Sequence, residues 1–251
     1  MEIDVNCDLG EHAGSGNPGN DELIMPFISS ANIACGFHAG DPFTIENTVM
    51  LARKYGVRIG AHPSYPDREN FGRKSLKMSD MELRETLICQ ISAVKTIAEA
   101  AGERLVHVKP HGALYNDAAA NYDLARTIVM AIKEIDSSLL IYGPSSSQLK
   151  NAAAEEGMKF IEEFFADRAY NDDGSLVARN IEGSVLYDTN SVIERVIRMI
   201  TEKEVITITG KTINISAETV CIHGDNEMAP VFARELMTRL KTAGISVQPV
   251  R

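Results

Sequence analysis

The feature that most constrains the fold is a regular alternation of short β-rich runs with longer helical patterns along the whole chain. Strands are expected at residues 3–7, 31–35, 57–61, 105–108, 139–142, 159–165 and 220–223. Helices are expected at residues 21–28, 44–55, 80–101, 122–135, 146–156, 189–202 and 227–243. Such alternation implies a parallel sheet whose strands are joined by helical crossovers.

The number and continuity of these units favour a closed barrel over an open doubly wound sheet. Seven βα units follow one another without a linker, so we expect one α/β domain over residues 1–251, a seven-stranded parallel βα barrel of the TIM type. The segment 204–216 breaks the alternation. Two alternating runs around Gly210 predict a β-hairpin inserted before the last strand.

Polar residues gather on one face and at one end of the predicted strands. Side chains alternate across a strand, so residues two apart share a face. In five strands an apolar set is expected to face the helices, for example Ile3, Val5 and Cys7 in the first and Val106 and Val108 in the fourth. The opposite sets, expected inside the barrel, are Asn6 and Asp8; Asn32 and Ala34; Gly60 and His62; His107, Lys109 and His111; and Cys221, His223 and Asp225.

This polarity predicts a site at the carboxyl ends of the strands, where barrel enzymes place their active sites. An isolated buried polar group explains a single position such as His107 better, but not five strands together. The loops that follow the strands add Glu11, His38, Asp41, Arg73 and the neighbouring Asp167 and Arg168. Asp41 is also placed to cap the next helix, since Pro42 follows it. Arg73 could clamp a carboxylate or a phosphate.

Histidines are frequent among these positions, and two chemistries remain open for them. His38, His62, His111 and His223, with Asp8 or Asp225, could form a nitrogen and oxygen metal site. The same groups could serve acid–base catalysis without a metal. The presence of a metal is therefore left open, with His38, His62 and His223 as its candidate ligands.

The net charge and the first residues of the chain limit the classes of partner and the compartment that we expect. The chain has 25 Lys and Arg against 35 Asp and Glu, a formal net charge of −10. This balance argues against nucleic acid or an anionic membrane as the main partner, because both attract a positive surface. The first residues lack a basic and an apolar segment, and no apolar run reaches membrane-spanning length. We expect a soluble cytoplasmic protein.

Several long segments together resemble the LamB/YcsF family, to which the 5-oxoprolinase A subunits belong. The resemblance is carried by residues 4–11, 31–41, 60–67, 71–73, 108–116, 165–170 and 222–226. It implies ATP-dependent opening of 5-oxoproline (pyroglutamate) to glutamate, together with separate B and C subunits. It also implies a seven-stranded βα barrel related to carbohydrate deacetylases.

The nucleotide motifs of the chain itself are weak. Residues 210–212 (Gly-Lys-Thr) resemble the end of a P-loop, but position 205 is valine rather than glycine. ATP with Mg is therefore expected to act through the complex with subunits B and C. Two alternatives stay open: a metal-dependent amide hydrolase or deacetylase that needs no ATP, and a non-catalytic subunit that binds 5-oxoproline.

Lactam opening needs a base, a proton donor and a counter-charge for the oxyanion. Asp8 or Glu11 is expected as general base, His111 in proton transfer, and Lys109 as the counter-charge. In a simpler alternative, Lys109 pairs structurally with Asp8 across the barrel. The expected substrate-binding residues are Asn6, Asn32, His38, Asp41, His62, Arg73, Asp167, Arg168, His223 and Asp225.

Overall fold

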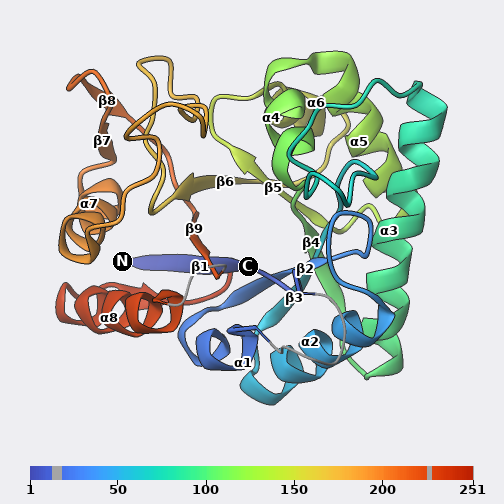
Figure 1. Cartoon of the computed structure of the whole chain (residues 1–251), viewed down its shortest axis with the longest axis horizontal. Helices are drawn as coiled ribbons and strands as arrows, with labels where there is room; N and C mark the ends of the chain where they lie inside the picture. Colours follow the sequence, from blue (N-terminus) through green and yellow to red (C-terminus); the bar gives the residue numbers. More distant parts are fainter. Residues whose placement is uncertain (13–18, 225–227, 251) are drawn as a thin grey trace.

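Seven parallel strands close into a barrel in the computed structural model, which describes residues 1–12, 19–224 and 228–250 (Figure 1). The strands run in the order β1-β2-β3-β4-β5-β6-β9, and β9 pairs with β1 to complete the ring. They are β1 (Glu2–Leu9), β2 (Ser30–Ala34), β3 (Arg58–His62), β4 (Leu105–Val108), β5 (Leu140–Pro144), β6 (Phe160–Phe165) and β9 (Thr219–His223). The predicted seven-stranded parallel barrel is confirmed.

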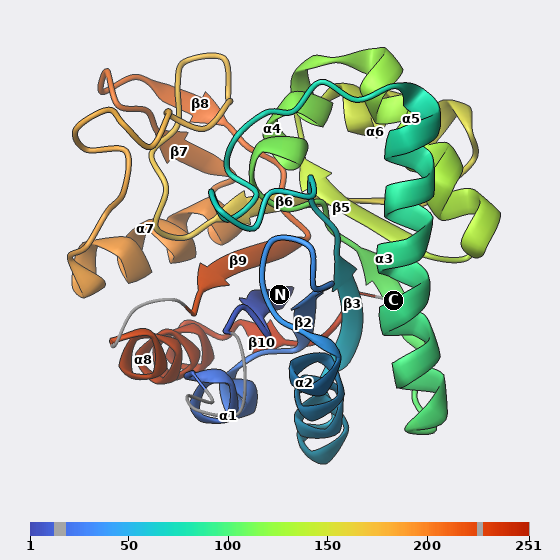
Figure 2. The same cartoon turned by 45° about the vertical axis from the view of Figure 1, so that its right-hand side comes forward.

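Helices surround this ring, as a second view shows (Figure 2). They are α1 (Asp21–Ile24), the 3₁₀-helix η1 (Met25–Phe27), α2 (Pro42–Tyr55), α3 (Asp80–Ala100), α4 (Gly112–Ala120), α5 (Tyr122–Ile135), α6 (Gln148–Glu155), α7 (Thr189–Thr201) and α8 (Ala229–Thr242). The sequence did not predict α4, a short helix that begins directly after His111. None of the helices in the described ranges is long and apolar enough to cross a membrane.

Local sequence explains where two of these helices begin. The Asp41 carboxylate accepts a hydrogen bond from the Thr44 amide at the start of α2, and Pro42 occupies the first turn. At α3 the Ser79 hydroxyl and the Glu82 carboxylate form a reciprocal capping box. Both caps satisfy amide groups that have no partner inside the helix.

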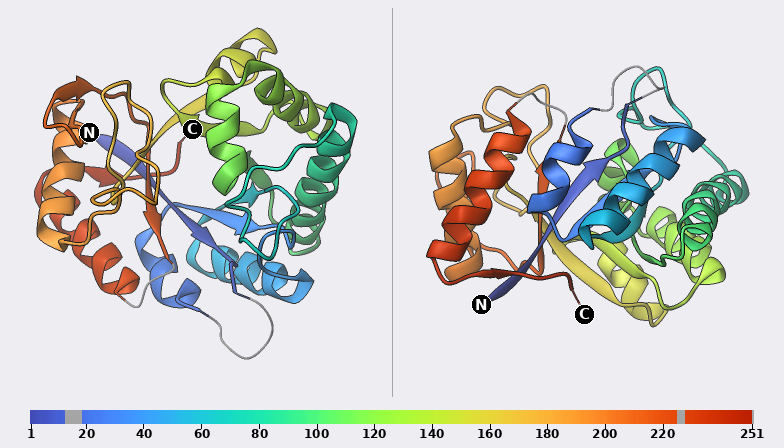
Figure 3. Two further views of the ribbon diagram at one scale, coloured as in Figure 1. Left: turned by 45° about the horizontal axis from the view of Figure 1, so that its top comes forward. Right: turned by 90° about the horizontal axis from the view of Figure 1, so that it is seen from below.

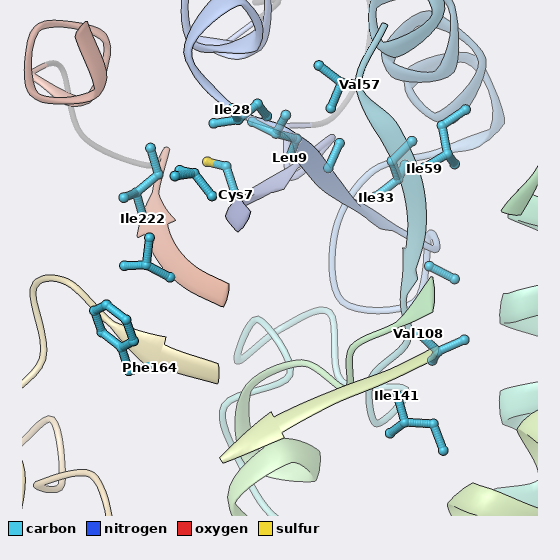
Figure 4. Packing of buried hydrophobic residues seen from close by; sticks show 14 of the residues in the cluster. Cys7, Leu9, Ile28, Ile33, Val57, Ile59, Val108, Ile141, Phe164 and Ile222 are labelled. Atoms are coloured by element: carbon cyan, nitrogen blue, oxygen red, sulfur yellow. The ribbon is translucent and has the colours of Figure 1, made fainter. Parts of the chain in front are cut away.

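The apolar strand faces pack outward against the helices. Cys7, Ile33, Ile59, Val108 and Ile222 belong to one buried cluster, and Figure 4 shows these side chains on the outside of the ring of strands. This confirms the face predicted from alternation for most of the barrel.

The expected outward position of Val106 is wrong. The pairing of β3 with β4 shifts its register between Ile59 and Gly60. As a result Leu105 and Val108, three residues apart, both join the outer cluster, while Val106 packs with the inner residues Leu140, Tyr142 and Ile161. A one-residue irregularity moves a side chain to the other face of a sheet.

The predicted insertion is present as an antiparallel hairpin of β7 (Glu204–Ile206) and β8 (Thr212–Asn214). Gly210 in its turn has a φ of 88°, which glycine adopts easily. Figure 3 shows the hairpin beside α7, outside the ring of strands. A further strand, β10 (Ser246–Val247), pairs with the beginning of β1, and its two residues were too few to predict.

Candidate functional site

A cavity of about 630 Å³ opens at the carboxyl ends of the barrel strands. Its wall includes Asp8, Glu11, His62, Lys109 and His111, which come from the ends of β1, β3 and β4 or the loops that follow. His38 is not part of the wall, but its ring stacks on that of His111 with centroids 3.8 Å apart. The structure thus brings together the residues that strand alternation placed at this end.

Lys109 lies at the floor of the cavity and is almost fully buried. Its Nζ lies 2.9 Å from Asp8 Oδ1, 2.9 Å from Glu163 Oε1, 3.0 Å from Cys221 Sγ and 3.2 Å from Asn6 Oδ1. Burial alone would lower the pKa of Lys109, but Asp8, Cys221 and Glu163 outweigh it and raise that pKa well above its usual value. The ammonium group therefore stays charged and holds Asp8 in place.

Each carboxylate oxygen of Asp8 has its own partners. Oδ1 accepts from Lys109 and, at 2.8 Å, from Asn32 Nδ2, while Oδ2 lies 3.3 Å from His62 Nε2. Burial would raise the pKa of Asp8, but His62 and Lys109 hold it well below the usual range. Asp8 is thus an ionised carboxylate with one oxygen directed toward the histidines.

Beneath this floor lies a layer of fully buried polar side chains. Asn6 and Asn32 are 0% exposed and lie outside the wall of the cavity. Asn32 accepts a 2.7 Å hydrogen bond from His107 Nε2 and donates to Asn6. These residues support Asp8 and Lys109 from below.

Two histidines at the cavity wall are each anchored by a backbone carbonyl. His62 Nδ1 lies 2.7 Å from the Lys109 carbonyl oxygen, and His111 Nε2 lies 2.9 Å from the Phe71 carbonyl oxygen. The remaining nitrogens of the two rings, His62 Nε2 and His111 Nδ1, are 2.9 Å apart. Burial lowers the pKa of His111, which favours the neutral imidazole.

Glu11 lies between two imidazoles at the edge of the cavity. Its Oε1 is 3.2 Å from both His38 Nε2 and His111 Nδ1, and its side chain is 15% exposed. Burial would raise the pKa of Glu11, but the bonds to His111 and His38 hold it below the usual range. Burial lowers the pKa of His38 to about 4. Glu11 is therefore an ionised carboxylate that borders the cavity.

The loop around Phe71 places His111, a role the sequence did not reveal. Phe71 has a φ of 55°, in a region that non-glycine residues rarely adopt, and this turns its carbonyl toward His111. Gly72 also has a positive φ, and a Cβ there would lie 3.0 Å from both His111 Cδ2 and His38 Cβ. The Phe-Gly pair therefore serves the histidines directly.

A second group lies across the mouth from the histidines. His223 Nδ1 is 2.8 Å from Asp167, its Nε2 is 3.3 Å from an Arg179 nitrogen, and its ring stacks on Phe165. Burial would lower the pKa of His223, but Asp167 raises it. Asp167 and His223 are thus brought together, as a pair separate from Glu11 and His38.

The other predicted site residues have different surroundings. Arg73 borders the cavity with its guanidinium 4.8 Å from the centre of the Phe71 ring. Arg168 also borders it, but donates to the carbonyls of Val177 and Ser184 and so holds its own loop. Asp41 caps α2 and is not part of the cavity wall. Asp225 lies outside the described residues.

Glu163 is the main site residue that sequence reasoning missed. Its carboxylate binds Lys109 and accepts a 2.8 Å hydrogen bond from the Tyr115 hydroxyl. Strand alternation could have found it, because Glu163 lies on the inward face of β6, between Ile161 and Phe165. Tyr115 and Ser64, which contacts His38, had no comparable signal.

Three groups of side chains within the described ranges have donor atoms close enough to share a metal ion. They are Asp8, His62 and His111; Glu11, His38 and His111; and Asp8, Cys221 and His223, with donor atoms within 4.8 Å of one another in each group. His111 is common to the first two. The chemistry available to the cavity is therefore carboxylate base, imidazole and metal binding, next to a buried cation.

Comparison with known sequences gives a consistent result. The profile of the LamB/YcsF family matches residues 3–251. The chain is 48% identical over 248 residues to the 5-oxoprolinase A subunit of Acinetobacter baylyi, covering 99% of this chain and 98% of that protein. It is 45% identical over 249 residues to the protein of the same name from Clostridium beijerinckii, covering 99% and 98%.

Solved structures are also similar. The lactam utilization protein of Thermus thermophilus has a TM-score of 0.94 and 38% identity, with 100% of both chains covered. The catalytic domain of a peptidoglycan N-acetylglucosamine deacetylase from Eubacterium rectale has a TM-score of 0.52 and 13% identity, covering 100% of this chain and 88% of that one. At that identity the second likeness concerns the fold alone.

Proposed function

The chain belongs to the LamB/YcsF family, and on that premise we propose that it is the A subunit of a 5-oxoprolinase and opens the lactam ring of 5-oxoproline at the barrel mouth. The observation that carries this proposal is near-full-length identity, at 44% or more, with relatives named as 5-oxoprolinase A subunits. The cavity supports it, because two ionised carboxylates and several imidazoles surround a space large enough for a small lactam.

We assign the general base to Glu11. Its carboxylate borders the cavity and lies between His38 and His111, which orient it. It would take a proton from the attacking water and return it to the ring nitrogen as the carbon–nitrogen bond breaks. Proton transfer, which the sequence assigned to His111, thereby moves to Glu11, because His111 Nε2 is committed to the Phe71 carbonyl.

Lys109 fits a positioning role better than direct contact with the oxyanion. Its three protons are shared among four acceptors from Asp8, Glu163, Cys221 and Asn6. No proton is left over for a substrate oxygen unless one of these contacts is given up. Its charge would act on the reaction through Asp8, which is the structural pairing that the sequence left open.

ATP enters the proposal through partner subunits. Hydrolysis of an unstrained five-membered lactam is unfavourable without coupling, so the amide must be activated. Phosphoryl transfer from MgATP to the lactam oxygen can do this, with ADP leaving at that step and phosphate leaving as glutamate forms. The sequence lacks a phosphate-cradling loop. We therefore propose that B and C subunits complete the enzyme, and that this ATP-dependent complex works in the cytoplasm.

Reconstitution tests the proposal. We expect glutamate to form from 5-oxoproline when the chain, the B and C subunits and MgATP are all present, and not when any one is omitted. Glutamate formed by the chain alone without ATP would favour the metal-dependent amide hydrolase. Glutamate formed by B and C without this chain would leave it no more than a binding role and would contradict the proposal.

A further inference from the structure

Three acceptor atoms converge at the wall of the cavity: His62 Nε2, His111 Nδ1 and Asp8 Oδ2. The two nitrogens are 2.9 Å apart, and Asp8 Oδ2 is 3.3 Å from His62 Nε2. All three side chains are at most 10% exposed. Their protonation decides what the cluster can bind.

The backbone fixes which ring nitrogens carry protons. A carbonyl oxygen can only accept, so His62 donates its Nδ1 proton to Lys109 and His111 donates its Nε2 proton to Phe71. In the neutral rings, His62 Nε2 and His111 Nδ1 therefore both present lone pairs. Lys109 and Asn32 both donate to the other oxygen of Asp8, Oδ1, and not to Oδ2. Without a metal ion, a proton on one of these nitrogens serves the contacts with Asp8 and Glu11. A metal ion at the centre would replace that proton and accept the lone pairs of all three atoms.

We propose that Asp8, His62 and His111 bind one divalent cation of the zinc class, with a further coordination position open to the cavity. Two imidazoles and one carboxylate are a ligand set of catalytic zinc sites. Ligands about 2.0–2.1 Å from a zinc ion at tetrahedral angles lie about 3.3 Å from one another. Two of the three pairs here are 2.9 and 3.3 Å apart, and the third lies within 4.8 Å. Carbonyl partners on the second nitrogen of each ligating histidine are also typical of metal sites.

The other two groups of possible ligands are less suitable. His38 Nδ1 lies 2.9 Å from the Ser64 hydroxyl, which can donate or accept, so His38 can carry its proton on Nε2 and donate it to Glu11. Cys221 Sγ is bound by Lys109, and His223 is held by Asp167. Only in the group of Asp8, His62 and His111 are both histidine tautomers set by backbone carbonyls. Of the four histidines that the sequence offered as ligands, this group keeps His62 and His111 and leaves out His38 and His223.

The chemistry of the ion, unlike its binding, rests on the proposed function. A cation at this position would polarise an oxygen of the activated lactam and lower the pKa of bound water. Glu11, next to His111, is placed to accept the proton of that water. Metal binding is measured without substrate or partner subunits, so its outcome is separate from that of the reconstitution.

The first test uses the unaltered chain, purified without chelators. Mass spectrometry of the metal content should give about one zinc-class ion per chain, removed by EDTA and restored by Zn²⁺. Co²⁺ added to the stripped chain should give visible ligand-field absorption, and both ions should raise the melting temperature. A chain that carries no metal, and that binds neither Zn²⁺ nor Co²⁺ in these titrations, would overturn the proposal.

The second test locates the ligands. His62→Gln and His111→Gln should each weaken Zn²⁺ binding about 100-fold or more, since loss of a ligand costs at least as much as loss of an outer-shell partner. His38→Gln and His223→Gln are matched controls from the same mouth and should retain the ion. Loss of the ion in either control, with retention in His62→Gln, would contradict this assignment. If the ligand variants do not fold, the Co²⁺ spectrum of the unaltered chain together with the two controls decides.

Discussion

At the scale of single residues, the charge of Lys109 organises the floor of the cavity. The ammonium group lies between Asp8 and Glu163, at 2.9 Å from each, in a place with almost no solvent. A buried charge is tolerated when opposite charges and hydrogen bonds surround it, and its removal leaves the partners unpaired. The same contacts keep one oxygen of Asp8 turned away from the histidines.

Replacing Lys109 by methionine tests this role. Lys109→Met keeps the length of the side chain and leaves two buried carboxylates without their cation, so we expect a loss of about 3–5 kcal/mol in the free energy of unfolding. For a chain of this size each kcal/mol lowers the melting temperature by about 2–4 °C. Thermal unfolding measures the effect, with the exposed Lys77→Met as control.

The double variant Lys109→Met/Glu163→Gln should recover part of the lost stability, because one of the two unpaired charges is gone. If Lys109→Met instead melts like the unaltered chain while turnover is abolished, Lys109 has a direct catalytic role and the structural account of it is wrong.

At the scale of elements, Gly60 leaves the space that His107 needs between β3 and β4 below the site. His107 extends across Gly60, and a Cβ at position 60 would lie 2.0 Å from His107 Nε2. That nitrogen binds Asn32, which binds Asp8. The register shift of the same strand pair begins beside Gly60. A side chain added at position 60 would therefore displace His107 and, through Asn32, disturb Asp8 at the floor of the cavity.

Gly60→Ala should therefore be destabilising. Forcing a methyl group into this space costs about 1–3 kcal/mol, because the buried ring must move. Urea unfolding measures the loss. In the His107→Asn background the same substitution should cost less, since the clashing ring is absent. Equal costs in both backgrounds would show that His107 does not limit the space at Gly60.

Strand alternation predicts much of the barrel and its mouth, and its failures have local causes. It places Asp8, His62, Lys109 and His111 on one face because β1, β3 and the end of β4 keep the two-residue period. It misplaces Val106 because a register shift is a property of a strand pair, which one strand's sequence does not show. It gives no sign that Phe71 supplies a carbonyl to His111, because that contact depends on a backbone conformation.

At the scale of the whole molecule, the barrel presents its reactive groups at one open end. The other end is filled by polar contacts: the buried Asp4 accepts from Ser29, Ser30, Thr219 and Tyr142. A reactant or a partner subunit can therefore reach Glu11 and His111 through the mouth, where the cavity of about 630 Å³ opens.

The purified chain alone should not hydrolyse ATP, with or without 5-oxoproline. The sequence offers no phosphate-cradling loop, and the glycine and lysine at 210 and 211 lie in the connection between β7 and β8. Phosphate release measures the activity, with the reconstituted complex as positive control. ATP turnover by the isolated chain that 5-oxoproline stimulates would contradict the assignment of nucleotide chemistry to partner subunits.

The most direct test of the barrel mouth as the reaction site is glutamate formation by the reconstituted complex carrying Glu11→Gln. This change keeps the shape of the side chain and removes its basicity, so turnover should fall by about 10²–10⁴-fold while the chain still unfolds cooperatively. Glu22→Gln, which alters an exposed carboxylate paired with Lys54, should leave turnover unchanged. Full turnover by a folded Glu11→Gln complex would contradict the account.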